Sequence, residues 1–352
     1  MRRPRPFSSL RLSSILAAVL LLVALGACAT VDAPAPNAAP ASNTTAAPDH
    51  TSETTAPARD STSADEAPGQ EPAARPVTAW ELVRGDARVL LFGSIHVGTP
   101  DIYPLPPAYQ NALEAADRLI VEVAVDQIDQ AEYTQIIGQV AYLDGDRTLQ
   151  DLVDVDDWPT VTAALERYQI PRGNVLSIKP FFLDTTLATL AAAEAGFDSQ
   201  FGMDLWFLRE ARSRNMPTLA LETASEQLGY LADLPQDVQI TSLVVTAEAA
   251  VDGRAADDVG RLVEAVTTAD IEELESILGE GYDEYPELRE IYQLLFVERN
   301  RRWADEIDAH TEIAGTSLVV VGAGHLVGDE NLREILRSRG YQERQITVTD
   351  SF

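Results

Sequence analysis

Two short segments of the sequence, residues 93–96 and 322–325, carry side chains that could do chemistry. They read Gly-Ser-Ile-His and Gly-Ala-Gly-His, so each places a histidine three positions after a glycine. Each follows a run of β-forming residues, VLLF at 89–92 and SLVVV at 317–321, that predicts a buried strand. A histidine just past such a strand lies above the sheet edge, where open α/β sheets bind ligands. Two such units on neighbouring strands would direct two imidazole rings at one point.

The first glycine of each segment, Gly93 or Gly322, has an expected role in turning the chain. Glycine accepts a positive φ without a steric penalty, so we expect a sharp turn at the end of each strand. The chain has four histidines, and the other two lie in a low-complexity segment and at the end of a helical run. The two at strand ends, His96 and His325, share one motif, which favours a common site.

Two imidazole rings usually need carboxylates to complete a metal site or an acid/base site. Glu122 is the one acidic residue in the apolar run RLIVEV, and Glu222 has the same placement near the end of PTLALET. Asp204 opens a predicted helix, where it could either cap that helix or reach the site. These three residues are therefore the acidic site candidates.

The segment FVERNRRWADEI supplies two more site candidates, Arg299 and Asn300. A guanidinium group and an amide can both hold an anionic group. Their neighbours Arg301 and Arg302 indicate instead the solvated face of a helix.

Short apolar runs alternate with helical patterns along most of the chain, which predicts an α/β fold with a mixed, partly parallel sheet flanked by helices. A long helical stretch within 224–312 predicts an inserted helical region that covers one face of the sheet. Strands are expected at 89–92, 118–123, 217–223, 317–321 and 345–350, and helices at 106–118, 181–196, 203–215 and 331–340.

The first 27 residues have the features of an export signal. Four arginines precede an apolar run of 11 residues, Ile15 to Leu25, which is shorter than the about 20 residues that span a membrane. The run ends in Leu-Gly-Ala-Cys, which resembles a bacterial lipobox. The sequence thus predicts cleavage before Cys28, the single cysteine, and acylation of its thiol. Such a protein would be held on the cell envelope by its lipid, most simply on the outer membrane facing the periplasm.

Residues 28–76 consist mainly of Ala, Pro, Thr, Ser and acidic residues. They contain too few large apolar residues to offset the entropy of ordering, so we expect a disordered tether. The folded domain is then expected over residues 77–352.

The formal net charge of the chain is −30, from 26 basic and 56 acidic residues. Such a surface repels nucleic acid, so we expect no nucleic-acid partner. A Cys-rich zinc site is excluded by the single cysteine. A serine-hydrolase elbow is not indicated, because the sequence has no Gly-x-Ser-x-Gly motif.

With these motifs in order, the chain resembles the TraB/PrgY/GumN family, which includes the Tiki-type Wnt-cleaving proteases. The resemblance rests on LLFGSIHVGTPDIYPLP, RLIVEV, SIKPFFL, GFDSQFGMDLWFLREARSRNMPTLALETASEQL, ERNRRWADEI and VVVGAGHLVGDENLREILRSRGY, and it spans about residues 80–350. It implies a fold like that of erythromycin esterase and the haem-binding ChaN. It also implies a metal-dependent, peptidase-like site built from His96, Glu122 and His325.

The leading interpretation is a metal-dependent hydrolase that acts on a peptide or protein substrate. His96 and His325 would bind a divalent ion (Mn, Co, Fe or Zn), and Glu122 would be a third ligand or the general base. Arg299 and Glu222 would assist catalysis. Two alternatives remain open at this point: a metal-free, esterase-like hydrolase, and a protein that binds a peptide or haem without turnover.

Overall fold

A computed structural model describes residues 75–311 and 315–352. The predicted signal segment, the lipidation site Cys28 and nearly all of the predicted tether lie outside these residues. Within them, no helix combines the length and apolar character that crossing a bilayer requires.

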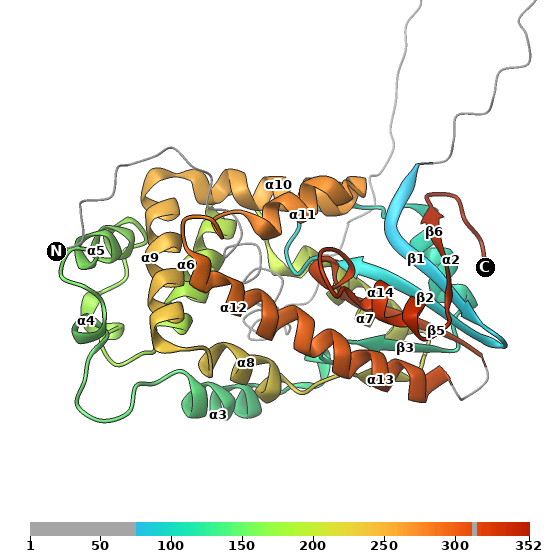
Figure 1. The fold of residues 1–352 in the computed structure, drawn as a ribbon, viewed down its shortest axis with the longest axis horizontal. Coiled ribbons are helices and arrows are strands. Elements are labelled where there is room, and N and C mark those ends of the chain that lie inside the picture. The colour runs from blue at the N-terminus through green and yellow to red at the C-terminus, as the bar shows by residue number, and fades with distance from the viewer. Residues whose placement is uncertain (1–74, 312–314) are drawn as a thin grey trace, which may run out of the picture.

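A six-stranded mixed sheet forms the centre of the domain, in the order β4-β3-β5-β2-β1-β6 (Figure 1). Neighbouring strands β4, β3, β5 and β2 run parallel, whereas β1 is antiparallel to both β2 and β6. This arrangement confirms the predicted fold class. The strands are β1 (Pro76–Arg84), β2 (Ala87–Ser94), β3 (Arg118–Val121), β4 (Thr218–Ala220), β5 (Gly315–Gly322) and β6 (Gln342–Thr347).

Two strands differ from the sequence-based prediction. β1 was not predicted, and it forms a hairpin with β2 in which Arg84 pairs with Ala87 and Gly85 takes a φ of 60°. The last strand was expected at 345–350 but lies three residues earlier, because Thr347 and Asp350 form a turn beyond it.

Helices cover both faces of the sheet. Because successive side chains of a strand point to opposite faces, Leu90 and Phe92 pack with helices α2 and α7, while Leu91 packs with α13 and α14. Figure 1 shows α13 and α14 in front of the strands. The helices are α2 (Pro107–Ala115), α3 (Gln130–Val140), α4 (Leu149–Leu152), α5 (Trp158–Arg167), α6 (Pro180–Glu194), α7 (Met203–Ser213), α8 (Ala224–Ala232), α9 (Gln236–Asp252), α10 (Arg254–Thr268), α11 (Ile271–Gly279), α12 (Arg289–Tyr292), α13 (Arg299–Thr311) and α14 (Leu332–Ser338).

The predicted helical region does more than cover one face. Helices α5 and α6 both pack on α9 around an apolar cluster of their own, which includes Val161, Leu187 and Leu243. In Figure 1 these helices lie beside the sheet, at the opposite end of the molecule from β6.

Candidate functional site

The parallel pairing of β2 with β5 brings the two Gly-x-x-His segments side by side. Gly93 pairs with Val321 and Ser94 with Gly322, so both histidine loops leave the sheet at the same edge. The neighbouring strands β3 and β4 end at this edge too, and the backbone N–H of Glu222 donates to the carbonyl of Glu122 at 3.0 Å. The predicted carboxylates therefore follow strands that end where the histidine loops begin.

The expected reason for the two glycines is wrong. Gly322 has a φ of −51°, and Gly93 is not among the described glycines with positive φ. Gly93 is needed because of close packing: a Cβ there would lie 2.8 Å from Thr78 Cγ2 and 3.1 Å from Ala323 Cβ. The first loop is thus pressed against both β1 and the second loop.

Glu122 and Glu222 share one guanidinium group, that of Arg299, which is fully buried. Arg299 Nη2 lies 2.9 Å from Glu122 Oε2 and 2.5 Å from Glu222 Oε1. The other oxygen of Glu122 accepts a hydrogen bond from the backbone N–H of Gly322 at 2.5 Å. Glu122 therefore connects the β3 end, helix α13 and the second histidine loop.

A π-helical segment, η7 (Gln293–Glu298), places Arg299 and Asn300 at the start of α13. The wider turn of a π-helix is frequent at functional sites. Both side chains point into the interior, and Arg299 Nη1 also donates to the carbonyl of Leu295 at 2.8 Å.

His325 is held as a neutral ring. Its Nδ1–H donates to Asn300 Oδ1 at 2.7 Å, and its Nε2 accepts from Arg299 Nη1 at 3.1 Å. Burial, together with the positive charges of Arg299 and His96, holds the pKa of His325 well below its ordinary value.

His96 lies in the opposite electrostatic environment. Its Nδ1 is 3.1 Å from Asp204 Oδ2, although the approach is not aligned as a hydrogen bond. Burial alone would lower the pKa of His96, but the carboxylates of Asp204 and Glu122 outweigh that effect and raise it. Asp204 makes no capping hydrogen bond in α7, and the structure places its carboxylate beside His96.

The segment that carries Asp204 is fixed to the first histidine loop by the backbone. Met203 N–H donates to the carbonyl of Ile95 at 2.9 Å, and Gly98 exchanges two hydrogen bonds with Asp198. A Cβ at Gly202 would lie 2.6 Å from the His96 carbonyl oxygen, so only glycine lets the segments approach this closely. The His96–Asp204 pair is therefore set by the fold.

A small cavity of about 10 Å³ lies between these groups, and Ser94, His96, Glu122, Asp204 and Gln227 are among its lining residues. Within the described part of the chain, four buried polar atoms of three of these residues have no aligned hydrogen-bond partner: Ser94 Oγ, both ring nitrogens of His96 and Asp204 Oδ1. Buried polar atoms are rarely left unsatisfied, so their concentration in one cavity marks a place for a polar guest.

Two residues of this cluster were not predicted. Gln227 of α8 donates to Glu122 Oε2 at 3.0 Å. Arg302 was assigned to a solvated face, which is wrong: its Nη2 lies 2.7 Å from Glu222 Oε2 and its Nη1 donates to Tyr230. The assignment is correct for Arg301, which is exposed and pairs with Glu330.

The donor set His96, Glu122 and His325 does not fit a three-ligand metal site as it stands. His325 Nε2 is 3.7 Å from Glu122 Oε1, but Arg299 already donates to that nitrogen and to the other oxygen of Glu122. No three His, Cys, Asp or Glu side chains in residues 75–311 and 315–352 are arranged to hold a metal ion. A metal ligand role for these residues stays a prediction.

Comparison with known proteins agrees with this arrangement of motifs. The model of the TraB/PrgY/gumN family matches residues 78–345. The uncharacterized protein YbaP of Escherichia coli (strain K12) is 26% identical over 264 residues, which cover 72% of this chain and 89% of YbaP. The YbaP protein of Shigella flexneri gives the same identity and coverage. No solved structure matches the chain significantly. The chain belongs to the TraB/PrgY/gumN family.

Proposed function

We propose that the protein is a hydrolase of the bacterial cell envelope that cleaves an acyl bond, foremost a peptide bond, with a water held in the cavity at His96. The mature chain would be anchored through acylated Cys28, with its domain facing the periplasm. The observation that supports hydrolase activity is the group of unsatisfied buried polar atoms around one cavity. The preference for peptides rests on the resemblance to the Tiki-type proteases.

The two histidines have environments that drive their pKa values apart, which is how proteins separate acid and base roles. In the proposal, Asp204 orients His96, and the neutral form of His96 takes a proton from a water in the cavity while the water oxygen attacks the carbonyl carbon of the substrate. The Ser94 hydroxyl donates to the oxygen that becomes negative in the tetrahedral intermediate. The C–N bond breaks when the intermediate collapses. Protonated His96 then gives its proton to the leaving amine.

The remaining charges would keep the site assembled. Arg299 and Arg302 neutralise Glu122 and Glu222, and the Arg299–His325 contact keeps the second imidazole uncharged. Arg299 and Glu222 are therefore proposed as positioning residues, whereas His96 and Ser94 contact the substrate.

Peptide cleavage by four variants tests the proposal. His96→Ala should lower the rate by about 10²- to 10⁴-fold, the usual contribution of an acid/base group. Asp204→Asn should lower it less and shift the acid limb of the pH–rate profile to lower pH, because it removes the carboxylate that raises the pKa of His96. Ser94→Ala should reduce the rate by about 10²-fold at a similar KM. His310→Ala, on the partly exposed end of α13, is the matched control and should cleave like the unaltered protein.

Equal rates for His96→Ala and His310→Ala would exclude this proposal. Cleavage of ester but not amide substrates, with the same dependence on His96, would leave the site correct and identify an esterase. Binding of peptides with no product from any variant would identify a non-catalytic binder.

A second candidate is the same site with the predicted divalent ion bound. It is favoured by the unsatisfied Nε2 of His96, whose Nδ1 faces Asp204, and by Asn300, which orients His325 as outer-shell groups orient metal-bound histidines. For His325 to bind the ion, Arg299 would have to give up its hydrogen bond to His325 Nε2. Elemental analysis of protein purified without chelator tests this form: one Mn, Co, Fe or Zn per chain, lost in both His96→Ala and His325→Ala, supports it. Metal-free protein with full activity would exclude it.

A further inference from the structure

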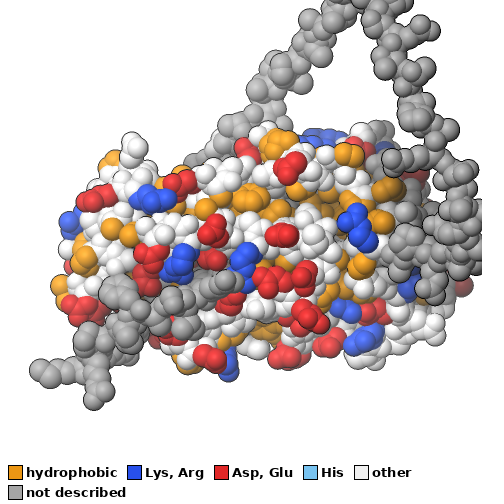
Figure 2. Space-filling view, turned by 90° about the horizontal axis from the view of Figure 1, so that it is seen from above, with side chains coloured by type: hydrophobic (Ala, Val, Ile, Leu, Met, Phe, Trp, Pro, Cys, Tyr) orange, Lys and Arg blue, Asp and Glu red, His pale blue; other side chains and the backbone are white. Residues whose placement is uncertain are grey.

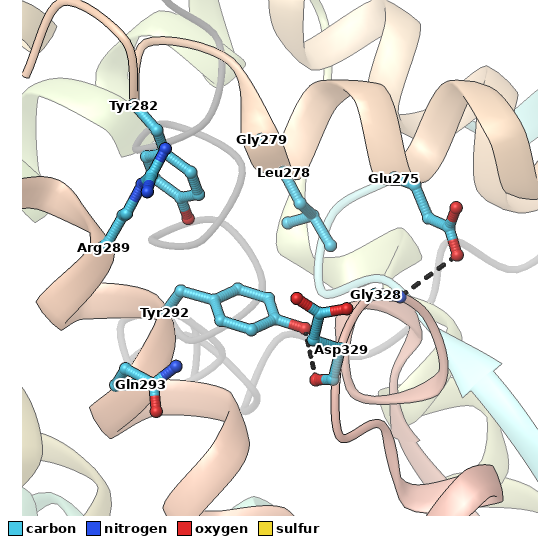
Figure 3. A pocket seen from close by; sticks show the side chains of 9 residues that line it. All are labelled: Glu275, Leu278, Gly279, Tyr282, Arg289, Tyr292, Gln293, Gly328 and Asp329. Carbon is cyan, nitrogen blue, oxygen red and sulfur yellow. Dashed lines mark hydrogen bonds between the residues drawn. The ribbon is translucent and has the colours of Figure 1, made fainter. Parts of the chain in front are cut away.

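A second and much larger cavity, of about 530 Å³, lies next to the second histidine loop. Its walls are the end of α11, the segment from Tyr282 to Gln293 and the loop residues Gly328 and Asp329 (Figure 3). This volume is in the range of pockets that bind small molecules. The cavity of about 10 Å³ at His96, by comparison, holds little more than one water.

The charges of the larger cavity are separated. Figure 3 shows Arg289 on one side of the cavity and the carboxylates of Glu275 and Asp329 on the other, with Tyr292 extending between them. Among the described residues, Arg289 has an ion pair within 4.0 Å only with Asp283, at 3.9 Å, and both side chains are well exposed. Such a pair is weak, so Arg289 is available to a ligand.

The middle of the cavity is suited to an apolar and hydrogen-bonding ligand. Leu278 and the rings of Tyr282 and Tyr292 form apolar walls, and the Gln293 amide can both donate and accept. Burial raises the pKa of Tyr282 to about 12, so this phenol is neutral at neutral pH. The order across the cavity is cation, apolar and amide surface, then anions.

Packed aromatic rings connect this cavity to His325 of the second histidine loop. Tyr292 donates to the backbone carbonyl of Asp329 at 2.8 Å, and its ring packs on Phe296 at 5.3 Å between centroids. Phe296 in turn packs on His325 at 4.9 Å. A Cβ at Gly328 would lie 2.4 Å from the Tyr292 hydroxyl, so the loop and the tyrosine are closely fitted. A ligand in this cavity therefore touches residues that hold the second histidine loop.

We propose that this cavity binds short peptides with both ends free. The terminal carboxylate would pair with Arg289, the terminal amine with Asp329 and Glu275, and an apolar side chain would pack on Leu278 and the tyrosine rings. This inference deepens the proposed function by naming the ligand class, and it rests on that function only for the steps after binding.

Isothermal titration calorimetry with D-leucyl-D-leucine tests the site, because a D-peptide resists cleavage and binding is then measured apart from turnover. The unaltered protein should bind it at least tenfold more tightly than the N-acetyl or the C-amide derivative, since each derivative lacks one charge. His96→Ala should bind it normally, so loss of cleavage and loss of binding are separate results.

Two variants test which residues bind the carboxylate end and the amine end of the dipeptide. Arg289→Gln should bind the free dipeptide and its amide equally, and the double variant Glu275→Gln/Asp329→Asn should bind the free dipeptide and its N-acetyl derivative equally. Arg337→Gln is the control, because Arg337 has a comparably exposed side chain with loose pairs, 3.7 Å from Glu334 and 3.6 Å from Glu343, and is not among the residues that line the cavity. No measurable binding of the free dipeptide at about 1 mM, or equal affinity for all three ligands in the unaltered protein, would overturn the proposal.

Discussion

Arg299 holds together the most heavily charged part of the interior. It is surrounded by Glu122, Glu222 and His325, and its side chain is fully buried. Burial lowers the pKa of Arg299, but the two carboxylates outweigh that effect and raise it, so the guanidinium stays charged. Removing one partner from such a group leaves the others as unpaired buried charges, which is far more costly than losing a surface pair.

Arg299→Leu should therefore lower the free energy of unfolding by about 3–5 kcal/mol. Arg301→Leu, two residues along the same helix, removes an exposed pair with Glu330 and should change it by less than about 1 kcal/mol. Urea unfolding followed by circular dichroism measures both. Coincident unfolding curves for the two variants would show that the buried network does not stabilise the fold.

At this scale the sequence predicted which polar side chains follow the strands. The positions of His96, Glu122, Glu222 and His325 could be predicted because an apolar run that ends in a polar residue marks the edge of a sheet. Gln227 and Arg302 were not found, since they lie on helices where which turn faces the site depends on tertiary packing. A helical sequence alone does not encode that choice.

Among the elements, the tight contact between the two histidine loops depends on Gly93. A Cβ at this position would overlap Thr78 on β1 and press on Ala323 in the second loop. Backbone and small side chains surround it, so little can move aside.

Gly93→Ala should therefore destabilise the protein by about 1–3 kcal/mol, the usual cost of overpacking, and should reduce activity because both loops shift. Gly138→Ala is the matched control: this exposed glycine of α3 has open space around it, and alanine there should stabilise the helix by about 0.5–1 kcal/mol. Thermal unfolding measures whether each substitution raises or lowers the stability. A Gly93→Ala protein as stable as the Gly138→Ala protein would contradict the packing argument.

Helices α6 and α9 enclose a buried carboxyl group, Asp184, which accepts a hydrogen bond from Ser242. Burial raises the pKa of Asp184 to about 6, whereas the same side chain in an unfolded chain has its ordinary pKa of 3.8. The folded protein thus binds the proton more tightly, so this group's contribution to stability is complete below pH 3.8 and is lost as the pH rises to about 6.

Asp184→Asn should remove that dependence. As the pH rises from 4 to 7, the stability of the variant relative to the unaltered protein should increase by about 1–3 kcal/mol, because the folded and unfolded pKa values of Asp184 differ by about 2 and each pH unit is worth about 1.4 kcal/mol. Melting temperatures at pH 4.5 and pH 7.5 measure it. The idea fails if the difference between the variant and the unaltered protein is the same at both values.

The element pattern was predicted in outline because strands and helices have different periods. The hairpin strand β1 was missed because its apolar residues do not alternate regularly and Glu81 lies among them. The π-helical turn before Arg299 was missed because one extra residue in a turn leaves no mark in a helical pattern. The position of α5, α6 and α9 beside the sheet follows from the packing of α5 and α6 on α9, which no local signal gives.

For the whole molecule, charge and attachment are linked. The chain carries a net charge of −30, and Figure 2 shows acidic side chains scattered among basic and apolar ones over the face in view, with no large patch of one sign. Such a surface is repelled by anionic lipid headgroups. Electrostatic attraction would thus not hold this domain at a membrane, and the proposed acyl chains on Cys28 would have to.

Cys28→Ser should accordingly move the protein from the membrane pellet to the soluble fraction, since at least two acyl chains are needed for stable anchoring. Ser61→Ala, in the same predicted tether, should remain in the pellet. Peptide cleavage per molecule should be unchanged in both, because the proposed site lies wholly in the folded domain. The fractions are compared at low and at high salt: a Cys28→Ser protein that still sediments at low salt but dissolves at high salt would show that charge holds it, against the sign of its surface.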